Sequence, residues 1–214
     1  MTTAIIGVGN LGGTVARHLV GGGESVVLAA KDEARAQALA DELGPNASAA
    51  SVEDAIAGSD VVILATWLDQ TKELVPARTR LLEGKVVVDP SNPIGFENGQ
   101  MIRTLPEAQS SGSVVAALLP TGAHYVKAFG TLGAVEQLAT SANREPRVVL
   151  FYATDDVAAE AAAQRLIRAA GFEPFKVGGL SDAGRIEGPD GEFQGRIFDL
   201  DEARAAVATD GVKA

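Results

Sequence analysis

Gly7-Val8-Gly9-Asn10-Leu11-Gly12 follows directly on the apolar run Ala4-Ile5-Ile6 near the start of the chain. Glycines at this spacing, placed where a short apolar strand ends and a helix begins, are typical of dinucleotide-binding sites. Helical spacing follows at once, because Val15 and Leu19 lie four residues apart. Three glycines after Val20 then end the pattern. The sequence therefore predicts a strand, a glycine-rich turn and a helix at the amino terminus.

Each glycine of this loop has a separate physical reason. Gly7 permits a tight turn, Gly9 lets the backbone approach a pyrophosphate, and Gly12 lets the helix pack closely on the strand. Asn10 and Leu11 complete the loop, and the first amides of the helix present N–H donors and a positive dipole end to phosphates. We therefore predict that these five residues bind the pyrophosphate of a dinucleotide.

Composition narrows the class of protein. The chain has 214 residues, 46% of them hydrophobic, which suffices for one sizeable core. A net charge of -10 argues against a nucleic-acid partner and against an anionic membrane surface. The chain has no cysteine and two histidines, so we expect no disulfide, no thiolate chemistry and no metal centre. The opening Met1-Thr2-Thr3 does not resemble a signal peptide, and no apolar run reaches the roughly 18 residues of a membrane span. We expect a cytoplasmic protein.

Apolar strands alternate with helical patterns along the chain, which predicts an α/β fold with a parallel sheet covered on both faces. We expect a Rossmann-type doubly wound sheet in residues 1–145 and a small C-terminal lobe in residues 146–214 that packs on or extends the same sheet. A homodimer built from that lobe is the expected assembly. The expected strands are Thr3 to Gly7, Ser25 to Ala29, Ala47 to Ser51, Asp60 to Leu64, Lys85 to Asp89, Tyr125 to Phe129, Arg147 to Ala153 and Phe175 to Val177.

The helices and loops follow from the same reading. Residues 113–118 fit either a helix or a strand, and Pro90 to Gln100 is expected to be a loop because Pro90 and Pro93 interrupt it. The expected helices are residues 10–20, Asp32 to Leu43 with Asp32 as its cap, Val52 to Ala57, Asp69 to Leu82 and Asp156 to Ala170.

The end of the second strand indicates which dinucleotide is bound. NAD sites usually place an acidic side chain there to bind the ribose hydroxyls, but this strand ends Leu28-Ala29-Ala30-Lys31. Lys31 and Arg35 instead provide two cations that suit a 2′-phosphate. Asp32 can reach the ribose, although capping the second helix is its simpler role. We therefore favour NADP(H), held at Ala30, Lys31 and Arg35.

The loops after the other strands are expected to complete the site, since ligands bind at the carboxyl ends of such sheets. Ala65-Thr66-Trp67 follows the fourth strand, and Asn92 lies between two prolines after the fifth. Trp67 either closes the edge of the sheet or covers the cofactor. Asn92 is a rigid amide donor and acceptor, or a turn element.

The sequence offers no clear catalytic pair. His124, Tyr125 and Lys127 are the candidate proton donors if the substrate is a carbonyl or an imine. We expect His124 to be an exposed turn residue without a carboxylate partner. Lys127 stands in a mostly apolar strand, and we expect it to point to solvent, the alternative being an ammonium group inside the site.

Several motifs together resemble the NADPH-dependent oxidoreductases of the deazaflavin (coenzyme F420) reductase family. They are residues 6–12, Leu28-Ala29-Ala30-Lys31, residues 88–93, residues 126–132, residues 169–174 and Arg185-Ile186-Glu187. The resemblance implies hydride exchange between NADPH and a deazaflavin. It also places Ala30-Lys31 where the family typically has Ser-Arg at the 2′-phosphate.

Two other functions stay open. One is an NADPH-dependent reductase of a small imine or ketone, and the other is a non-enzymatic NADP(H) sensor of redox state. For a deazaflavin or flavin-like acceptor, we expect the ring to dock between the fourth to sixth strands and residues 178–186. The glycines of that segment would allow close approach, and Arg185 would meet an anionic tail or form a surface salt bridge.

Overall fold

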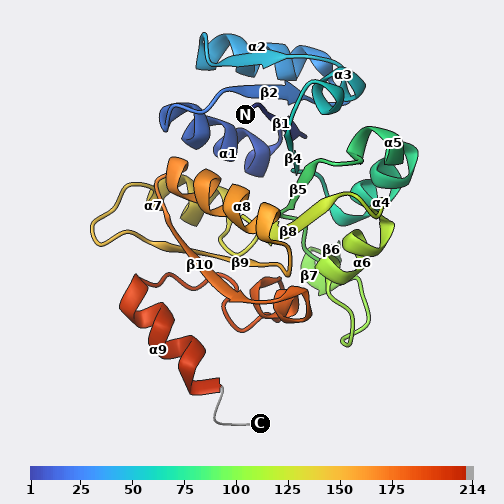
Figure 1. Cartoon of the computed structure of the whole chain (residues 1–214). Coiled ribbons are helices and arrows are strands. Elements are labelled where there is room, and N and C mark those ends of the chain that lie inside the picture. The colour runs from blue at the N-terminus through green and yellow to red at the C-terminus, as the bar shows by residue number, and fades with distance from the viewer. Residues whose placement is uncertain (211–214) are drawn as a thin grey trace.

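One eight-stranded sheet forms the centre of the molecule, in the order β10-β9-β8-β5-β4-β1-β2-β3. This computed structural model describes residues 1–210, and Figure 1 shows helices on both faces of the sheet. The predicted α/β, doubly wound fold is confirmed. The strands are β1 (Thr3–Ile6), β2 (Val26–Ala29), β3 (Ala47–Ala49), β4 (Val61–Leu64), β5 (Val86–Asp89), β8 (His124–Ala128), β9 (Val149–Ala153) and β10 (Glu173–Gly178).

The strands do not all run in one direction. β1 to β5 and β8 are parallel, whereas β9 is antiparallel to β8 and β10 is parallel to β9. The expectation of a parallel sheet is therefore wrong for its last two strands. The chain between β8 and β9 stays near the carboxyl edge and makes no crossover, so β9 starts where β8 ends. The residues after 146 thus extend the main sheet, and β9 and β10 end level with Lys127 of β8.

Alternating apolar residues bury both faces of the sheet. In β1, Ile5 packs into one core, and Ala4 and Ile6 pack into the other. The first core lies under α1 (Asn10–Gly21), α2 (Glu33–Leu43), α7 (Ala139–Ser141), α8 (Val157–Ala169) and the π-helical turn η1 (Ala134–Leu138). The second lies under α3 (Val52–Ala57), α4 (Leu68–Ala77), α5 (Thr79–Leu82) and α6 (Ser111–Leu118).

Residues 178–210 form a third apolar cluster around β9. Phe151 of β9 stacks on Phe193 with ring centroids 4.7 Å apart, and Phe198 packs edge-on against both. The short helix η2 (Leu180–Ile186) and α9 (Leu200–Asp210) close this cluster. Neither element was expected from the sequence, although Leu200, Ala203 and Val207 of α9 recur at helical spacing and pack into this cluster.

Helix starts agree with the sequence, but one helix is divided. The side chain of Asp32 accepts a hydrogen bond from the Arg35 amide at 3.3 Å, so Asp32 caps α2 as expected. Residues 113–118 lie in the helix α6. The helix expected over Asp69 to Leu82 is interrupted at Arg78, between α4 and α5. Pro76 has no amide to donate, which weakens the last turn of α4.

The expected loop from Pro90 to Gln100 is wrong. It contains β6 (Ile94–Glu97), which pairs with β7 (Gln100–Arg103) in an antiparallel hairpin. The two turn residues, Asn98 and Gly99, have φ values of 51° and 78°. Two positive φ angles define the tight turn that Asn-Gly favours between antiparallel strands, so this pair was the available signal.

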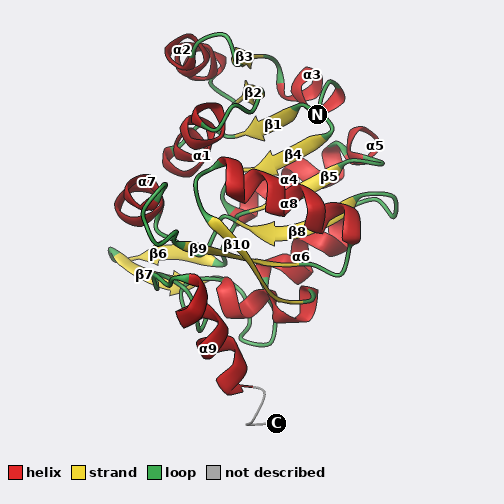
Figure 2. Cartoon of the chain, turned by 60° about the vertical axis from the view of Figure 1, so that its left-hand side comes forward, coloured by secondary structure: helices red, strands yellow, loops and turns green. Residues whose placement is uncertain are grey.

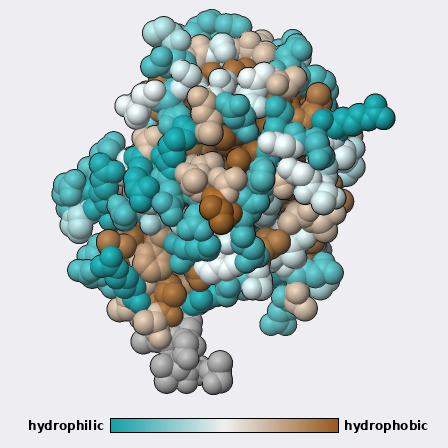
Figure 3. All heavy atoms as spheres, in the orientation of Figure 1, coloured by the Kyte–Doolittle hydropathy of each residue, from teal (hydrophilic) through white to brown (hydrophobic). Residues whose placement is uncertain are grey.

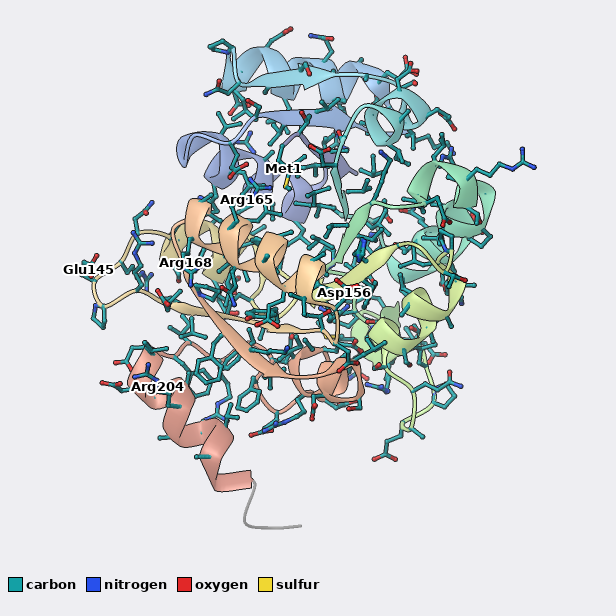
Figure 4. The ribbon with its side chains drawn as sticks, viewed as in Figure 1. Met1, Glu145, Asp156, Arg165, Arg168 and Arg204 are labelled. Carbon is teal, nitrogen blue, oxygen red and sulfur yellow. The ribbon has the colours of Figure 1, made fainter. Side chains whose placement is uncertain are left out.

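Hydrophilic residues cover most of the face seen in Figure 3, and its apolar residues form separate spots. Within residues 1–210, every helix is too short or too polar to cross a membrane. At the start of α8, Figure 4 labels Asp156, and further along the helix Arg165 lies near Met1. Arg165 also pairs with Glu24, which ties α8 to the turn after α1.

Candidate functional site

The glycine loop lies at the carboxyl edge of the parallel strands. In Figure 2 the arrowheads of these strands point toward the side on which α7 and the β6–β7 hairpin lie. Gly7 follows β1 and has a φ of +99°, a conformation that side chains rarely adopt. The amide of Gly7 donates to the carbonyl of Ala29 at 2.7 Å, which holds the loop against the end of β2.

The space around the three glycines differs in a way that matches their expected roles. A Cβ on Gly12 would lie 1.9 Å from the carbonyl oxygen of Gly7, and one on Gly7 would lie 2.4 Å from that of Ala65. A Cβ on Gly9 would meet no atom within 4 Å. Two glycines therefore allow close packing, and the third leaves open space at the loop surface. The contact with a pyrophosphate stays a prediction.

The amino end of α1 has backbone N–H groups that can donate hydrogen bonds. No side chain caps this helix, and no acidic residue stands in its first turn, which contains Asn10, Leu11 and Gly12. The first amides of a helix lack partners within the helix, so they are available to water or to an anion. This end of α1 therefore fits the phosphates of a dinucleotide.

The cations expected at the 2′-phosphate lie at the junction of β2 and α2. Lys31 precedes the cap Asp32, so it lies before α2 and does not share a helix face with Arg35. Both side chains are exposed. The carboxylate of Asp32 caps α2, so it is not directed at the expected position of the ribose.

The loop after β4 lies against the glycine loop. The Ala65 carbonyl is next to Gly7, and Thr66 Oγ1 is 2.7 Å from Thr71 Oγ1 of α4. Trp67 is 58% exposed, so it does not close the edge of the sheet. Its ring meets that of Phe96 edge-on, with centroids 6.3 Å apart. Covering the cofactor stays a prediction for Trp67.

Asn92 joins three segments of the carboxyl edge. Its Nδ2 donates to the Gly130 carbonyl at 2.8 Å, and its Oδ1 accepts from the Gly188 amide at 3.2 Å. Phe129 turns the chain into this contact with a φ of 65°, which is strained for a buried aromatic residue. The amide of Asn92 is therefore used inside the protein, and its contact with a cofactor stays a prediction.

Below these loops lies a buried polar network centred on Lys127. The side chain of Lys127 is fully buried, so the expectation that it points to solvent is wrong. Its Nζ donates to the Ser91 carbonyl and, at 2.8 Å, to Ser111 Oγ. It lies 3.5 Å from Asp89 Oδ2 and 3.7 Å from Glu187 Oε1. The carbonyl, the hydroxyl and the two carboxylates around this ammonium group offset the cost of burying its charge.

Two carboxylates complete the network. Glu187 accepts from the amides of Ser111 and Gly112 at 2.7 and 2.8 Å, so it binds the start of α6. Asp89 accepts from the hydroxyl of Tyr125 at 2.8 Å. Burial, followed by the charge of Asp89, raises the pKa of Tyr125 well above its usual range. Tyr125 is therefore a neutral donor engaged by Asp89, and the role of Glu187 in this network was not expected from the sequence.

His124 lies at the opposite, amino edge. It starts β8, and its Nδ1 is 2.7 Å from Asp156 Oδ2, so the expected exposed turn histidine without a carboxylate is wrong. The partner could not be found in the sequence because it lies 32 residues away, across the antiparallel β8–β9 pair. Burial raises the pKa of Asp156, but the Ala159 amide and His124 outweigh it and lower the pKa overall.

The segment expected to receive a hydride acceptor starts level with the end of β8. Gly178 pairs with Ala153, which in turn pairs with Lys127 near the carboxyl end of β8, and docking of an acceptor at this segment stays a prediction. A Cβ on Gly178 would meet Asp182, and one on Gly179 would meet Asp155, so side chains of the protein already occupy these approaches. Arg185 pairs with Glu192 at 2.8 Å. A Cβ on Gly112 would lie 2.9 Å from the Cβ of Ala183, so this segment packs against the start of α6, which Glu187 also binds.

Two buried hydroxyls at the carboxyl edge have no partner among the described residues. They are Ser91 Oγ, after β5, and Thr131 Oγ1, after β8. Buried hydroxyls normally form hydrogen bonds, so these two are exceptions at this edge. Sequence reasoning did not single them out, although both stand in the loops that it placed at this edge.

The arrangement defines a class: a Rossmann domain whose glycine loop, uncapped helix and free cations lie together at one edge of the sheet. Residues 2–93 match the model of the family described as NADP oxidoreductase, coenzyme F420-dependent. The resemblance seen in the motifs is thus confirmed for this region. The match to this family of NADP-dependent oxidoreductases covers less than half of the chain.

Individual proteins resemble a longer part of the chain. The metalloreductase STEAP3 of Rattus norvegicus is 29% identical over 183 residues, which are 86% of this chain and 35% of that protein. The chain therefore spans about a third of this relative's length. A hypothetical protein of Sinorhizobium meliloti superimposes with a TM-score of 0.82 at 29% identity, covering 93% of this chain and 95% of the other. A protein provisionally described as an F420-dependent NADP reductase, from Arthrobacter sp., gives 0.73 at 25% identity, covering 85% and 86%.

Proposed function

We propose that this chain transfers a hydride between NADP(H) and a flavin- or deazaflavin-like acceptor at the carboxyl edge of the sheet. When bound, NADPH supplies a hydride with its two electrons, and the acceptor takes one further proton from solvent. The protein's own part is to bind the pyrophosphate at Gly9 and the start of α1, and to read the 2′-phosphate with Lys31 and Arg35.

One observation favours this acceptor class. The ionisable side chains of the network below the loops, Asp89, Lys127, Glu187 and Tyr125, are buried and bonded within it. His124 lies at the other edge. A carbonyl or imine would need a proton donor in reach, whereas a flavin-type ring needs the protein mainly to position it in a dry site.

An acceptor screen tests the proposal. NADPH oxidation is followed at the nicotinamide absorbance band with the deazaflavin coenzyme, riboflavin, simple ketones and cyclic imines. We expect multiple turnovers with a flavin or deazaflavin. Turnover with an imine or ketone alone would indicate a small-molecule reductase, and tight NADPH binding without turnover on any acceptor would indicate a redox sensor.

A further inference from the structure

Three large apolar side chains lie exposed together beside the glycine loop. Phe96 and Met101 are 62% and 53% exposed, and they are directly paired across the β6–β7 hairpin, which places them on the same face. Trp67, 58% exposed, packs edge-on against Phe96 with an interplanar angle of 85°. We call Trp67, Phe96 and Met101 the aromatic ledge.

The position of the ledge ties it to the cofactor site. Trp67 stands two residues after Ala65, whose carbonyl oxygen is the nearest atom to a Cβ built on Gly7. The hairpin that carries Phe96 follows β5 through Ser91 and Asn92, which also lie at the carboxyl edge. Trp67 therefore stands close to the glycine loop, and the hairpin is joined to it through the contact of Phe96 with Trp67.

Exposure of these side chains has a cost that a ligand would remove. Burying one large apolar side chain is worth about 1.5–3 kcal/mol, and apolar side chains that gather on a surface often mark a binding site. Rings set at right angles offer a flat molecule one face for stacking and one edge for a T-shaped contact. Three side chains are far fewer than the roughly 20 residues per partner of a stable protein interface.

We propose that the aromatic ledge binds the planar ring of the hydride acceptor, and that it selects a ring with an uncharged tail. This inference rests on the proposed function. The exposed carboxylate of Glu97 stands next to Phe96 at the end of β6, and the chain carries a net charge of -10. Both disfavour an acceptor with an anionic tail. A neutral flavin-type ring such as riboflavin or 5-deazariboflavin is the ligand class that fits.

Trp67 makes the test direct, because it is the only tryptophan in the chain. Its fluorescence is titrated with 5-deazariboflavin and with flavin mononucleotide, in the dark and without NADPH. We expect saturable quenching by both, with at least about threefold tighter binding of the uncharged ring. Phe96→Ala should weaken ring binding at least about fivefold.

The matched control is Val157→Ala, which removes an 83% exposed apolar side chain from the start of α8 at the amino edge. We expect ring binding by this variant to equal that of the wild type. Calorimetry with NADPH checks that Phe96→Ala keeps its cofactor affinity within about twofold, so a misfolded variant is recognised. Sedimentation of both variants reports whether the ledge instead contacts a second copy of the chain.

Unchanged ring affinity in a folded Phe96→Ala variant would overturn the inference, as would a dimer that this substitution dissociates without changing ring affinity. Tighter binding of the anionic flavin would overturn the tail selection. Failure of the proposed function looks different, because the wild-type protein would then bind no NADPH or would turn over no flavin-type acceptor while the ledge still bound the ring.

Discussion

Lys127 Nζ lies 3.7 Å from Glu187 Oε1, and both side chains are completely buried although they come from distant parts of the chain. The ammonium group also contacts Asp89 and the carbonyl of Ser91, and Glu187 binds the first amides of α6. One cation thus connects the end of β5, the start of α6 and the residues after η2. These are the segments that build one side of the carboxyl edge.

Replacing Lys127 by Met should strongly destabilise the protein. The substitution keeps the length of the side chain but leaves Asp89 and Glu187 buried without their cation, which costs about 3–5 kcal/mol. The control, Lys176→Met, breaks the partly exposed pair with Glu160 and should cost less than about 1 kcal/mol. The free energy of unfolding in urea at pH 7 measures both. Equal losses would show that the buried network is not held by its charge.

The two tyrosines should resist ionisation until the protein unfolds. Burial is the main cause that raises the pKa of both Tyr125 and Tyr152. A raised pKa in the folded state gives stability that is complete below about pH 10, the pKa of an unfolded tyrosine, and is lost as the pH rises toward the folded value. Absorbance of tyrosinate should therefore rise together with loss of the circular dichroism signal. Full ionisation of folded protein near pH 10 would contradict this.

Gly9→Asp should abolish NADPH binding without unfolding the protein. Gly9 is the N-cap of α1 with a φ of -72°, and aspartate is favoured at such positions. Its carboxylate would occupy the open space where we place the pyrophosphate. Gly21→Asp, which adds the same charge at the far end of α1, is the control and should bind NADPH normally. Calorimetry measures both, and wild-type affinity in a folded Gly9→Asp variant would rule out this phosphate site.

Removing Lys31 and Arg35 together should change cofactor choice. Each charge-assisted hydrogen bond to a 2′-phosphate contributes about 1.5–3 kcal/mol, so the Lys31→Ala, Arg35→Ala double variant should lose roughly tenfold or more in NADPH affinity. NADH affinity should change little. The charge-matched control is Arg144→Ala with Arg147→Ala, before β9, and should affect neither cofactor. Equal losses for NADPH and NADH in the first variant would show that its cations do not read the phosphate.

Most of the fold could be predicted from patterns between residues that are close in the sequence. The glycine loop, the caps Asp32 and Asp156, and the apolar strand runs each depend on neighbours in sequence, so they could be read from the chain. Asn98-Gly99 is also a local signal, because this pair favours the turn of a hairpin. The interruption by Pro90 and Pro93 nevertheless led to the prediction of a loop. The reversed direction of β9 had no such signal.

The candidate site was less predictable because its contacts are long-range. Lys127 looked out of place in an apolar strand, but only the fold brings Glu187 and Asp89 to it. His124 and Asp156 meet because β9 runs antiparallel to β8. The hairpin that places Phe96 against Trp67 was likewise absent from the sequence interpretation. In each case strand pairing decides which residues meet, and patterns along the sequence do not determine strand pairing.

Direct transfer of a hydride from NADPH to the acceptor ring is measured by isotope transfer. NADPH carrying deuterium at both hydrogen positions of C4 is incubated with the protein and 5-deazariboflavin, whose C5 keeps a carbon-bound hydrogen that does not exchange with water. We expect mass spectrometry to find one deuterium in the reduced ring for each NADPH oxidised. With the Gly9→Asp variant we expect no deuterated ring. Reduced ring without the label, or no NADPH oxidation at all, would contradict it.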